Sequence, residues 1–133
     1  MGDERRLADV AEGVRAAITT YTHALDDGRT NDIVATFCTD GSCEMPGLGR
    51  HEGHDALRRA YGTWKPIRPQ RHLISNTVVT QWDDGEAQAT SDFVFLMKGD
   101  GGWAVGVVGR YRDVLHRDGA VWRFHSRVAE FSA

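Results

Sequence analysis

The first part of the chain carries apolar residues at steps of three and four, the spacing of an amphipathic helix. Between Asp3 and Leu25 they form one stripe, made of Leu7, Val10, Ala11, Val14, Ala17, Ile18, Tyr21 and Leu25. Gly13 lies off the centre of this stripe and weakens the helix slightly. The run Asp26-Asp27-Gly28 follows, and Gly28 is a suitable C-terminal cap. The pattern therefore predicts one long helix that ends near Asp26.

Two shorter helices are predicted before Trp64. Thr30 is a candidate N-cap for a helix that carries Ile33, Val34 and Phe37 and closes at Asp40-Gly41. A third helix is expected from His54 to Tyr61, with Leu57, Ala60 and Tyr61 buried. The segment between them, Ser42 to Arg50, contains Pro46 and glycines, so we expect at most a small hairpin there.

After Trp64 the pattern changes to that of β-strands. Leu73, Ile74, Val78 and Val79 belong to a first strand, and three more strands are expected over residues 87–98, 103–116 and 121–131. The connections are short and contain an Asp-Gly pair or a glycine cluster, as hairpin turns do. Four long strands joined in this way predict an antiparallel meander. Helices first and strands last indicate an α+β fold, with helices packed on one face of a curved sheet.

Composition and charge exclude several classes of protein. The 133-residue chain is 41% hydrophobic and 26% charged, which favours a single globular domain over residues 1–133. Its net charge of −3 gives no electrostatic reason to bind nucleic acid or an anionic membrane. No apolar run approaches the roughly 20 residues of a membrane helix, and no secretory hydrophobic region precedes the first helix. We therefore expect a soluble, cytoplasmic domain.

The run Arg71-His72-Leu73-Ile74-Ser75-Asn76 is the most informative stretch for chemistry. Strand alternation places His72, Ile74 and Asn76 on one face, the face expected to meet the helices. A histidine and an asparagine among aliphatic residues are typical of the wall of a small-molecule pocket. A buried histidine whose nitrogen is satisfied by a backbone carbonyl would give the same pattern.

Asp26 offers this histidine a partner at the end of the first helix. A carboxylate bonded to one imidazole nitrogen fixes the tautomer and raises the basicity of the other nitrogen. The alternative is that Asp26 and Asp27 are solvated turn residues before a glycine.

Further polar residues lie on the last two predicted strands. Tyr111, Asp113 and Leu115 share one face by alternation, and Arg127 follows Trp122 on the final strand. An inward arginine would be a fixed cation for an anionic leaving group or enolate. A β-bulge would reverse either assignment, so the direction of these side chains stays open.

No sequence pattern indicates a cofactor or a metal. His51-Glu52-Gly53-His54 lacks the spacing of the zinc helix motif. Cys38 and Cys43 have no Cys or His at metal-binding spacing, and we interpret them as plain thiols. Nucleophile elbows and dinucleotide fingerprints are absent from the sequence. We expect no metal and no cofactor, so an enzyme of this sequence would use its side chains alone.

Three stretches together resemble a known family: "YTHALDDGRTNDIVATFCTDGSCEMPGLGRHEG", "RHLISN" and "GRYRDVLHRDGAVWRFHSR". The chain resembles SnoaL-like proteins of the nuclear transport factor 2-like superfamily, roughly from Leu7 to Val128. The resemblance implies a cystatin-like α+β roll, in which three N-terminal helices wrap a cone-shaped, mostly antiparallel sheet around a deep pocket. It also implies a homo-oligomer, a dimer or trimer.

Within that superfamily the chain is similar to scytalone dehydratase and hexachlorocyclohexane dehydrochlorinase. The resemblance implies catalytic roles for His72 and Asp26, with Arg127 at the place of the dehydrochlorinase arginine. Tyr21 partly matches the dehydratase's tyrosine pair, whereas the dehydrochlorinase's active-site lysine has no counterpart among Thr20, Tyr21 and Thr22.

These observations favour a cofactor-independent dehydratase, lyase or isomerase acting on a small, largely apolar cyclic or aromatic molecule. His72, oriented by Asp26, would remove a proton, and four residues would bind the substrate, namely Tyr21, Asn76, Tyr111 and Arg127. An aldol-type polyketide cyclase is a related alternative. A non-catalytic binding or assembly module with the same pocket is the alternative from another class.

Overall fold

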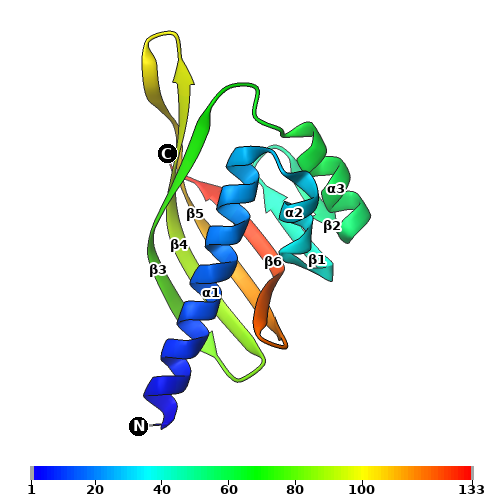
Figure 1. The fold of residues 1–133 in the computed structure, drawn as a ribbon, viewed down its shortest axis with the longest axis vertical. Coiled ribbons are helices and arrows are strands. Elements are labelled where there is room, and N and C mark those ends of the chain that lie inside the picture. Colours follow the sequence, from blue (N-terminus) through cyan, green and yellow to red (C-terminus); the bar gives the residue numbers. More distant parts are fainter. Residues whose placement is uncertain (1, 133) are drawn as a thin grey trace.

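The computed structural model describes residues 2–132, and its three helices all precede the long strands (Figure 1). Helix α1 spans Gly2–Asp27, α2 spans Thr30–Ala35 and α3 spans His54–Thr63. Most of the predicted stripe of α1 is buried, from Val10 to Tyr21, whereas Leu7 is 38% exposed. Helix α1 runs across one face of the sheet, while α2 and α3 lie beside the end that holds β1 and β2.

One six-stranded, curved sheet holds all the strands, in the order β2-β1-β6-β5-β4-β3. The strands are β1 (Phe37–Met45), β2 (Gly49–Glu52), β3 (Gln70–Trp82), β4 (Glu86–Gly99), β5 (Gly102–Asp118) and β6 (Val121–Phe131). The last four pair antiparallel in chain order, which confirms the predicted meander and the α+β class. Strand β1 joins β6 in parallel.

The prediction for the segment after α2 was wrong at its start. The short helix was expected to close at Asp40-Gly41, but it ends at Ala35, and Phe37 opens strand β1. The small hairpin expected after Ser42 is present, since β1 pairs antiparallel with β2. The start of strand β1 pairs in parallel with β6, whose residues come much later in the chain. The local sequence pattern therefore does not predict a strand at Phe37.

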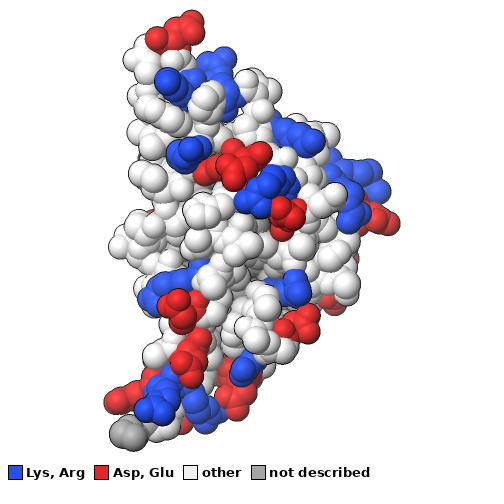
Figure 2. Space-filling model, in the orientation of Figure 1, with Lys and Arg blue, Asp and Glu red and all other residues white. Residues whose placement is uncertain are grey.

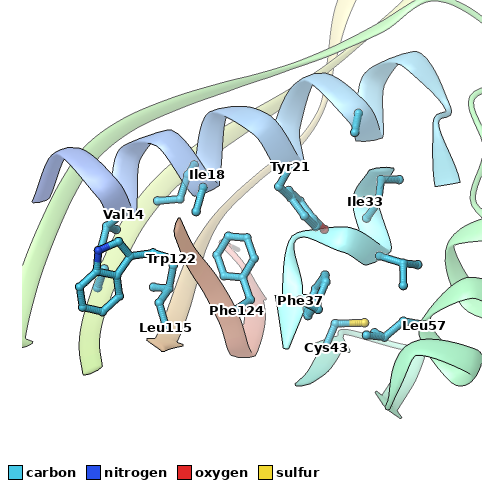
Figure 3. Packing of buried hydrophobic residues seen from close by; sticks show 14 of the residues in the cluster. Val14, Ile18, Tyr21, Ile33, Phe37, Cys43, Leu57, Leu115, Trp122 and Phe124 are labelled. Carbon is cyan, nitrogen blue, oxygen red and sulfur yellow. The ribbon is translucent and has the colours of Figure 1, made fainter. Parts of the chain in front are cut away.

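The main core lies between α1 and the inner face of the sheet (Figure 3). Val14, Ile18 and Tyr21 of α1 point towards the sheet. There they face the buried side chains of Leu115 and Phe124. Trp122, the second residue of β6, is 5% exposed. Burial of these side chains fixes α1 across the sheet and so places the end of the helix, near Asp26, over the start of β3.

Gly13 has a packing role that its place in the sequence pattern did not indicate. A Cβ atom at this position would lie 2.3 Å from Cδ1 of Trp122, much closer than van der Waals contact. The indole therefore packs directly on the backbone of α1, and only glycine leaves it that room.

We expect Gly13→Ala to destabilise the protein by about 1–2 kcal/mol. Overpacking costs about 1–3 kcal/mol, which exceeds the gain of up to about 1 kcal/mol in helix propensity. Gly62→Ala in α3 is the matched control, because no atom lies within 4 Å of its Cβ position. Urea unfolding should show the control to be neutral or stabilised. Equal effects of the two substitutions would contradict the packing role.

Acidic and basic side chains are interspersed on the face that α1 crosses, without an extended single-sign patch (Figure 2). Within residues 2–132, the helices include none that is long and apolar enough to cross a membrane.

Candidate functional site

An apolar cavity of about 240 Å³ opens between the inner face of the sheet and the ends of α1 and α3. Aromatic and aliphatic side chains supply most of its wall, and polar atoms come from Tyr21, Tyr61, Gln70, His72 and Tyr111. The other lining residues are Leu25, Met45, Leu48, Trp64, Phe93, Phe95, Val107, Ala129 and Phe131. Such a cavity suits a small, largely apolar molecule held in orientation by a few polar contacts.

Asp26 and His72 form the hydrogen bond that the sequence predicted. Nδ1 of His72 lies 2.6 Å from Oδ1 of Asp26, and the two side chains are 11% and 6% exposed. The backbone N–H of His72 donates to Oδ2 of Asp26 at 2.7 Å, and Nε2 of Gln70 donates to Oδ1 at 3.1 Å. The carboxylate thus joins the end of α1 to the start of β3.

These contacts favour the ionised form of Asp26 and set the tautomer of His72. Burial alone would raise the pKa of Asp26, but the hydrogen bonds from His72 and Gln70 outweigh it and hold this pKa below its usual value. An ionised carboxylate only accepts hydrogen bonds, so Nδ1 of neutral His72 carries the proton. Nε2 is then the basic nitrogen. The ring is flanked by Phe95, with ring centroids 4.6 Å apart, and by Phe93 at 6.1 Å.

Two tyrosine hydroxyls form a second polar group in the cavity wall. The hydroxyl groups of Tyr21 in α1 and Tyr61 in α3 are 2.6 Å apart. Burial raises the pKa of both phenols well above the usual value, so both stay neutral and able to donate hydrogen bonds. The sequence pointed to Tyr21 as a site residue, but it placed Tyr61 only among the buried residues of its helix.

Gln70 is a site residue that sequence reasoning missed. Its side chain is buried and bonded to Asp26. It lies two residues before His72, so the alternation that placed His72 and Ile74 inward would also have placed Gln70 inward.

Asn76 does not reach the cavity, contrary to the prediction. Its φ of 55° lies in the left-handed region, and the pairing of β3 with β4 shifts between Ser75 and Val78. This bulge reverses the alternation, so Asn76 is exposed and donates a hydrogen bond to Oδ2 of Asp92 at 2.9 Å.

Arg127 points inward, but it lies behind the cavity and does not line it. Its guanidinium carbon is 3.6 Å from the ring centroid of Tyr111, 4.3 Å from that of Tyr21 and 4.7 Å from that of Phe124. Its Nε is 3.2 Å from Oδ1 of Asp113, and both side chains are fully buried. The substrate contact expected for Arg127 is therefore wrong. Tyr111, in contrast, lines the cavity as expected, and burial raises its pKa to about 12.

The buried Asp113 gives an expected pH dependence of stability. Burial, partly offset by Arg127, raises the pKa of Asp113 from 3.8 to about 6. The folded protein thus holds this proton more tightly than the unfolded chain does. Its contribution to stability is present below pH 3.8 and is lost as the pH rises towards about 6. The loss is about 3 kcal/mol.

We expect Asp113→Asn to remove this fall in stability, because the amide has no proton to lose. Urea unfolding of both proteins across the same pH range measures the difference. Asp26, with its lowered pKa, acts in the opposite sense in both proteins and cancels in the comparison. The control Asp55→Asn, whose side chain is 90% exposed, should keep the wild-type slope. An unchanged slope in Asp113→Asn would show that Asp113 titrates like a solvated carboxyl.

One group of possible metal ligands includes Cys38, which the sequence analysis interpreted as a plain thiol. Its Sγ and a ring nitrogen from each of His116 and His125 all lie within 4.8 Å of one another. Cys38 is far from the two histidines in the sequence, so their spacing along the chain could not predict this group.

Comparison with known proteins identifies the fold and the family. The model of the SnoaL-like domain matches residues 5–128. Among curated proteins, no match to this chain is found. A nuclear transport factor 2-like protein of Novosphingobium aromaticivorans with a cystatin-like fold is 20% identical, with a TM-score of 0.86 over 98% of this chain and 86% of that one.

Two further solved structures are similar over nearly the whole chain. One, provisionally assigned as a scytalone dehydratase of N. aromaticivorans, is 19% identical, with a TM-score of 0.84 over 100% of this chain and 89% of that one. The other, from Catenulispora acidiphila in complex with S-DNPA, is 26% identical, with a TM-score of 0.83 over 93% and 94%. With the family model covering residues 5–128, this chain belongs to the SnoaL-like domain family, within the nuclear transport factor 2-like fold.

Proposed function

We propose that this chain is a cofactor-independent acid–base enzyme that eliminates water from a small, largely apolar cyclic molecule. The observation that carries the proposal is the partly buried Asp26–His72 hydrogen bond in the wall of an apolar cavity. A single SnoaL-like domain supplies the whole site in this proposal.

His72 is the proposed general base. Nε2 takes a proton from the carbon next to a carbonyl group, and Asp26 stabilises the imidazolium that forms. The electron pair of the broken C–H bond moves to the carbonyl oxygen and gives an enolate. When the enolate collapses, the C–O bond on the next carbon breaks, and the leaving hydroxide takes the proton from His72 as water. The pair returns to its starting state without an outside reactant.

The neutral Tyr21–Tyr61 pair is proposed to donate a hydrogen bond to the enolate oxygen. One phenol donates to the other, and the remaining hydroxyl proton is the one proposed to bind the substrate. Arg127 lies behind the rings of Tyr21 and Tyr111, where its charge, partly offset by Asp113, is proposed to favour negative charge in the cavity without touching the substrate.

The experiment is a panel of small cyclic β-hydroxy ketones incubated with the protein in D₂O. Elimination appears as absorbance of the conjugated enone, and proton removal alone appears as deuterium incorporation by NMR. Quenching of Trp64 fluorescence reports binding separately, because this ring lines the cavity.

A compound that binds in the cavity but shows neither elimination nor exchange would favour a binding protein instead. The largely apolar cavity wall supports that second candidate equally well, and the Catenulispora protein crystallised with S-DNPA supports small-molecule binding in this fold.

A further inference from the structure

Three potential metal ligands meet on the side of the sheet opposite the cavity. Cys38 in β1, His116 in β5 and His125 in β6 come from adjacent strands of the sheet. Their neighbours in sequence point into the core, namely Phe37, Leu115 and Phe124, so the three face outward. All three side chains are partly buried, and none lines the cavity.

Irregular strand pairing brings them together. Between β1 and β6 the register passes from Phe37 opposite Phe124 to Ser42 opposite Ser126, so four residues of β1 face the single residue His125. Gly41 allows this bulge, because a Cβ atom there would lie 2.7 Å from the carbonyl oxygen of Phe124. His125 is also the extra residue in the pairing of β6 with β5. Two bulges thus turn this histidine towards its neighbours.

The cluster contains polar atoms that the fold itself leaves without strong partners. Sγ of Cys38 is 3.7 Å from the carbonyl oxygen of Arg123, a weak contact. Nδ1 of His125 is fully buried and makes no hydrogen bond with the described residues. Its ring stacks on His116, with centroids 4.3 Å apart and 12° between the ring planes.

Carboxylates flank both imidazoles. Oε2 of Glu86 is 3.0 Å from Nε2 of His116, and Oδ1 of Asp40 is 3.7 Å from Nδ1 of His125. The neighbouring cation Arg123 is paired with Asp118 at 3.0 Å. Negative groups beside metal-binding histidines orient the rings and offset the charge of a cation.

We propose that Cys38, His116 and His125 bind a Zn²⁺ ion, with water in the remaining position. One thiolate and two imidazoles are ligands that Zn²⁺ prefers, and three protein ligands leave a coordination position open. In a tetrahedral site such ligand atoms are about 3.3–3.6 Å apart, so the cluster must contract by on the order of 1 Å. Cys38 binds as the thiolate, and its proton passes to solvent.

Coordination also changes the histidine stack. A metal lies in the plane of each imidazole that binds it, so two parallel stacked rings cannot share one ion without one of them turning. The terminal torsion of histidine is broad and permits this rotation. Bound zinc would then fasten β1 to β5 and β6 and stabilise the folded state in proportion to its concentration.

The test begins with the metal-free protein titrated with Co²⁺ and Zn²⁺ at neutral pH. We expect one ion per chain, a thiolate-to-Co²⁺ charge-transfer band, and a higher melting temperature with Zn²⁺. Cys38→Ser should abolish the band. His116→Asn and His125→Asn should each weaken Zn²⁺ binding by at least about 100-fold, more than the 10–100-fold typical of outer-shell changes. His23→Ala, on the exposed face of α1, is the control and should bind as wild type does.

Melting curves without metal show whether each variant is folded, so a loss of binding can be separated from a loss of structure. Absence of stoichiometric binding to the folded wild-type protein would overturn the proposal. Equal Zn²⁺ affinity of wild type and the three ligand variants would also overturn it, since the ion would then sit elsewhere. Neither result bears on the Asp26–His72 proposal, which uses a different face of the sheet.

Discussion

Replacing His72 with alanine is expected to lower the rate of elimination by about 10²–10⁴-fold and leave the fold intact. The loss follows because no other described side chain in the cavity wall pairs a basic nitrogen with a buried carboxylate. Deuterium exchange at the substrate carbon should fall by the same factor, since it needs only the base. The panel of β-hydroxy ketones supplies both measurements.

Asp26→Asn tests whether the two residues act as a unit. An amide can hold the imidazole in the wrong tautomer, so most of the same factor should be lost. The double variant should be no slower than His72→Ala alone, because effects within one catalytic unit do not add. Asp27→Asn is the matched control. This neighbouring carboxylate is 55% exposed and pairs with Arg29, so the rate should not change.

A structural histidine would behave differently. His72→Ala would then lower the melting temperature without a selective effect on rate, and Asp26→Asn would do the same. Full activity in both variants would remove the basis for the enzymatic proposal and leave the binding protein as the alternative.

Trp122→Ala is expected to lower the free energy of unfolding by about 3–5 kcal/mol. The indole is 5% exposed and packs on the backbone of α1 at Gly13, so its removal leaves a cavity that the rigid helix cannot fill. Urea unfolding measures the loss, and the melting temperature should fall by on the order of 10 °C or more.

Trp103→Ala provides the control for this substitution. Trp103 is the second residue of β5, beside the turn to β4, and is 48% exposed, so the change should stay within about 0.5 kcal/mol. Similar effects at the two tryptophans would contradict the assignment of Trp122 to the core.

The sequence pattern predicted the elements that depend on local periodicity. The apolar spacing in α1 and in the four strands after Trp64 repeats several times, so a single residue that breaks the pattern does not change the predicted element. The Asp26–His72 contact was also accessible, because it joins the end of one such element to the start of another. The first part of β1, from Phe37 to Gly41, was missed, since the strand has no alternation and its partner β6 lies far along the chain.

Side-chain direction failed where single residues interrupt the strands. Alternation before the bulge put His72 on the correct face, but the left-handed backbone of Asn76 turned that residue outward. In β6 the extra residue His125 also reverses the alternation, and Arg127 therefore points into the core. A bulge depends on backbone pairing with a neighbouring strand, so the alternation of apolar and polar residues along one strand cannot locate it.

The wall of the cavity has a fixed part and a variable part, with consequences for how such a site can diverge. Asp26, His72 and the tyrosine pair are tied to the core through buried hydrogen bonds and through the rings that enclose Arg127. Leu48 and Phe131, in contrast, line the cavity from a turn and a strand end, and they are half exposed. Substitutions at this rim can change which molecules enter at little cost to stability. A lineage could therefore change which molecules it binds while inheriting the same Asp26–His72 and Tyr21–Tyr61 contacts.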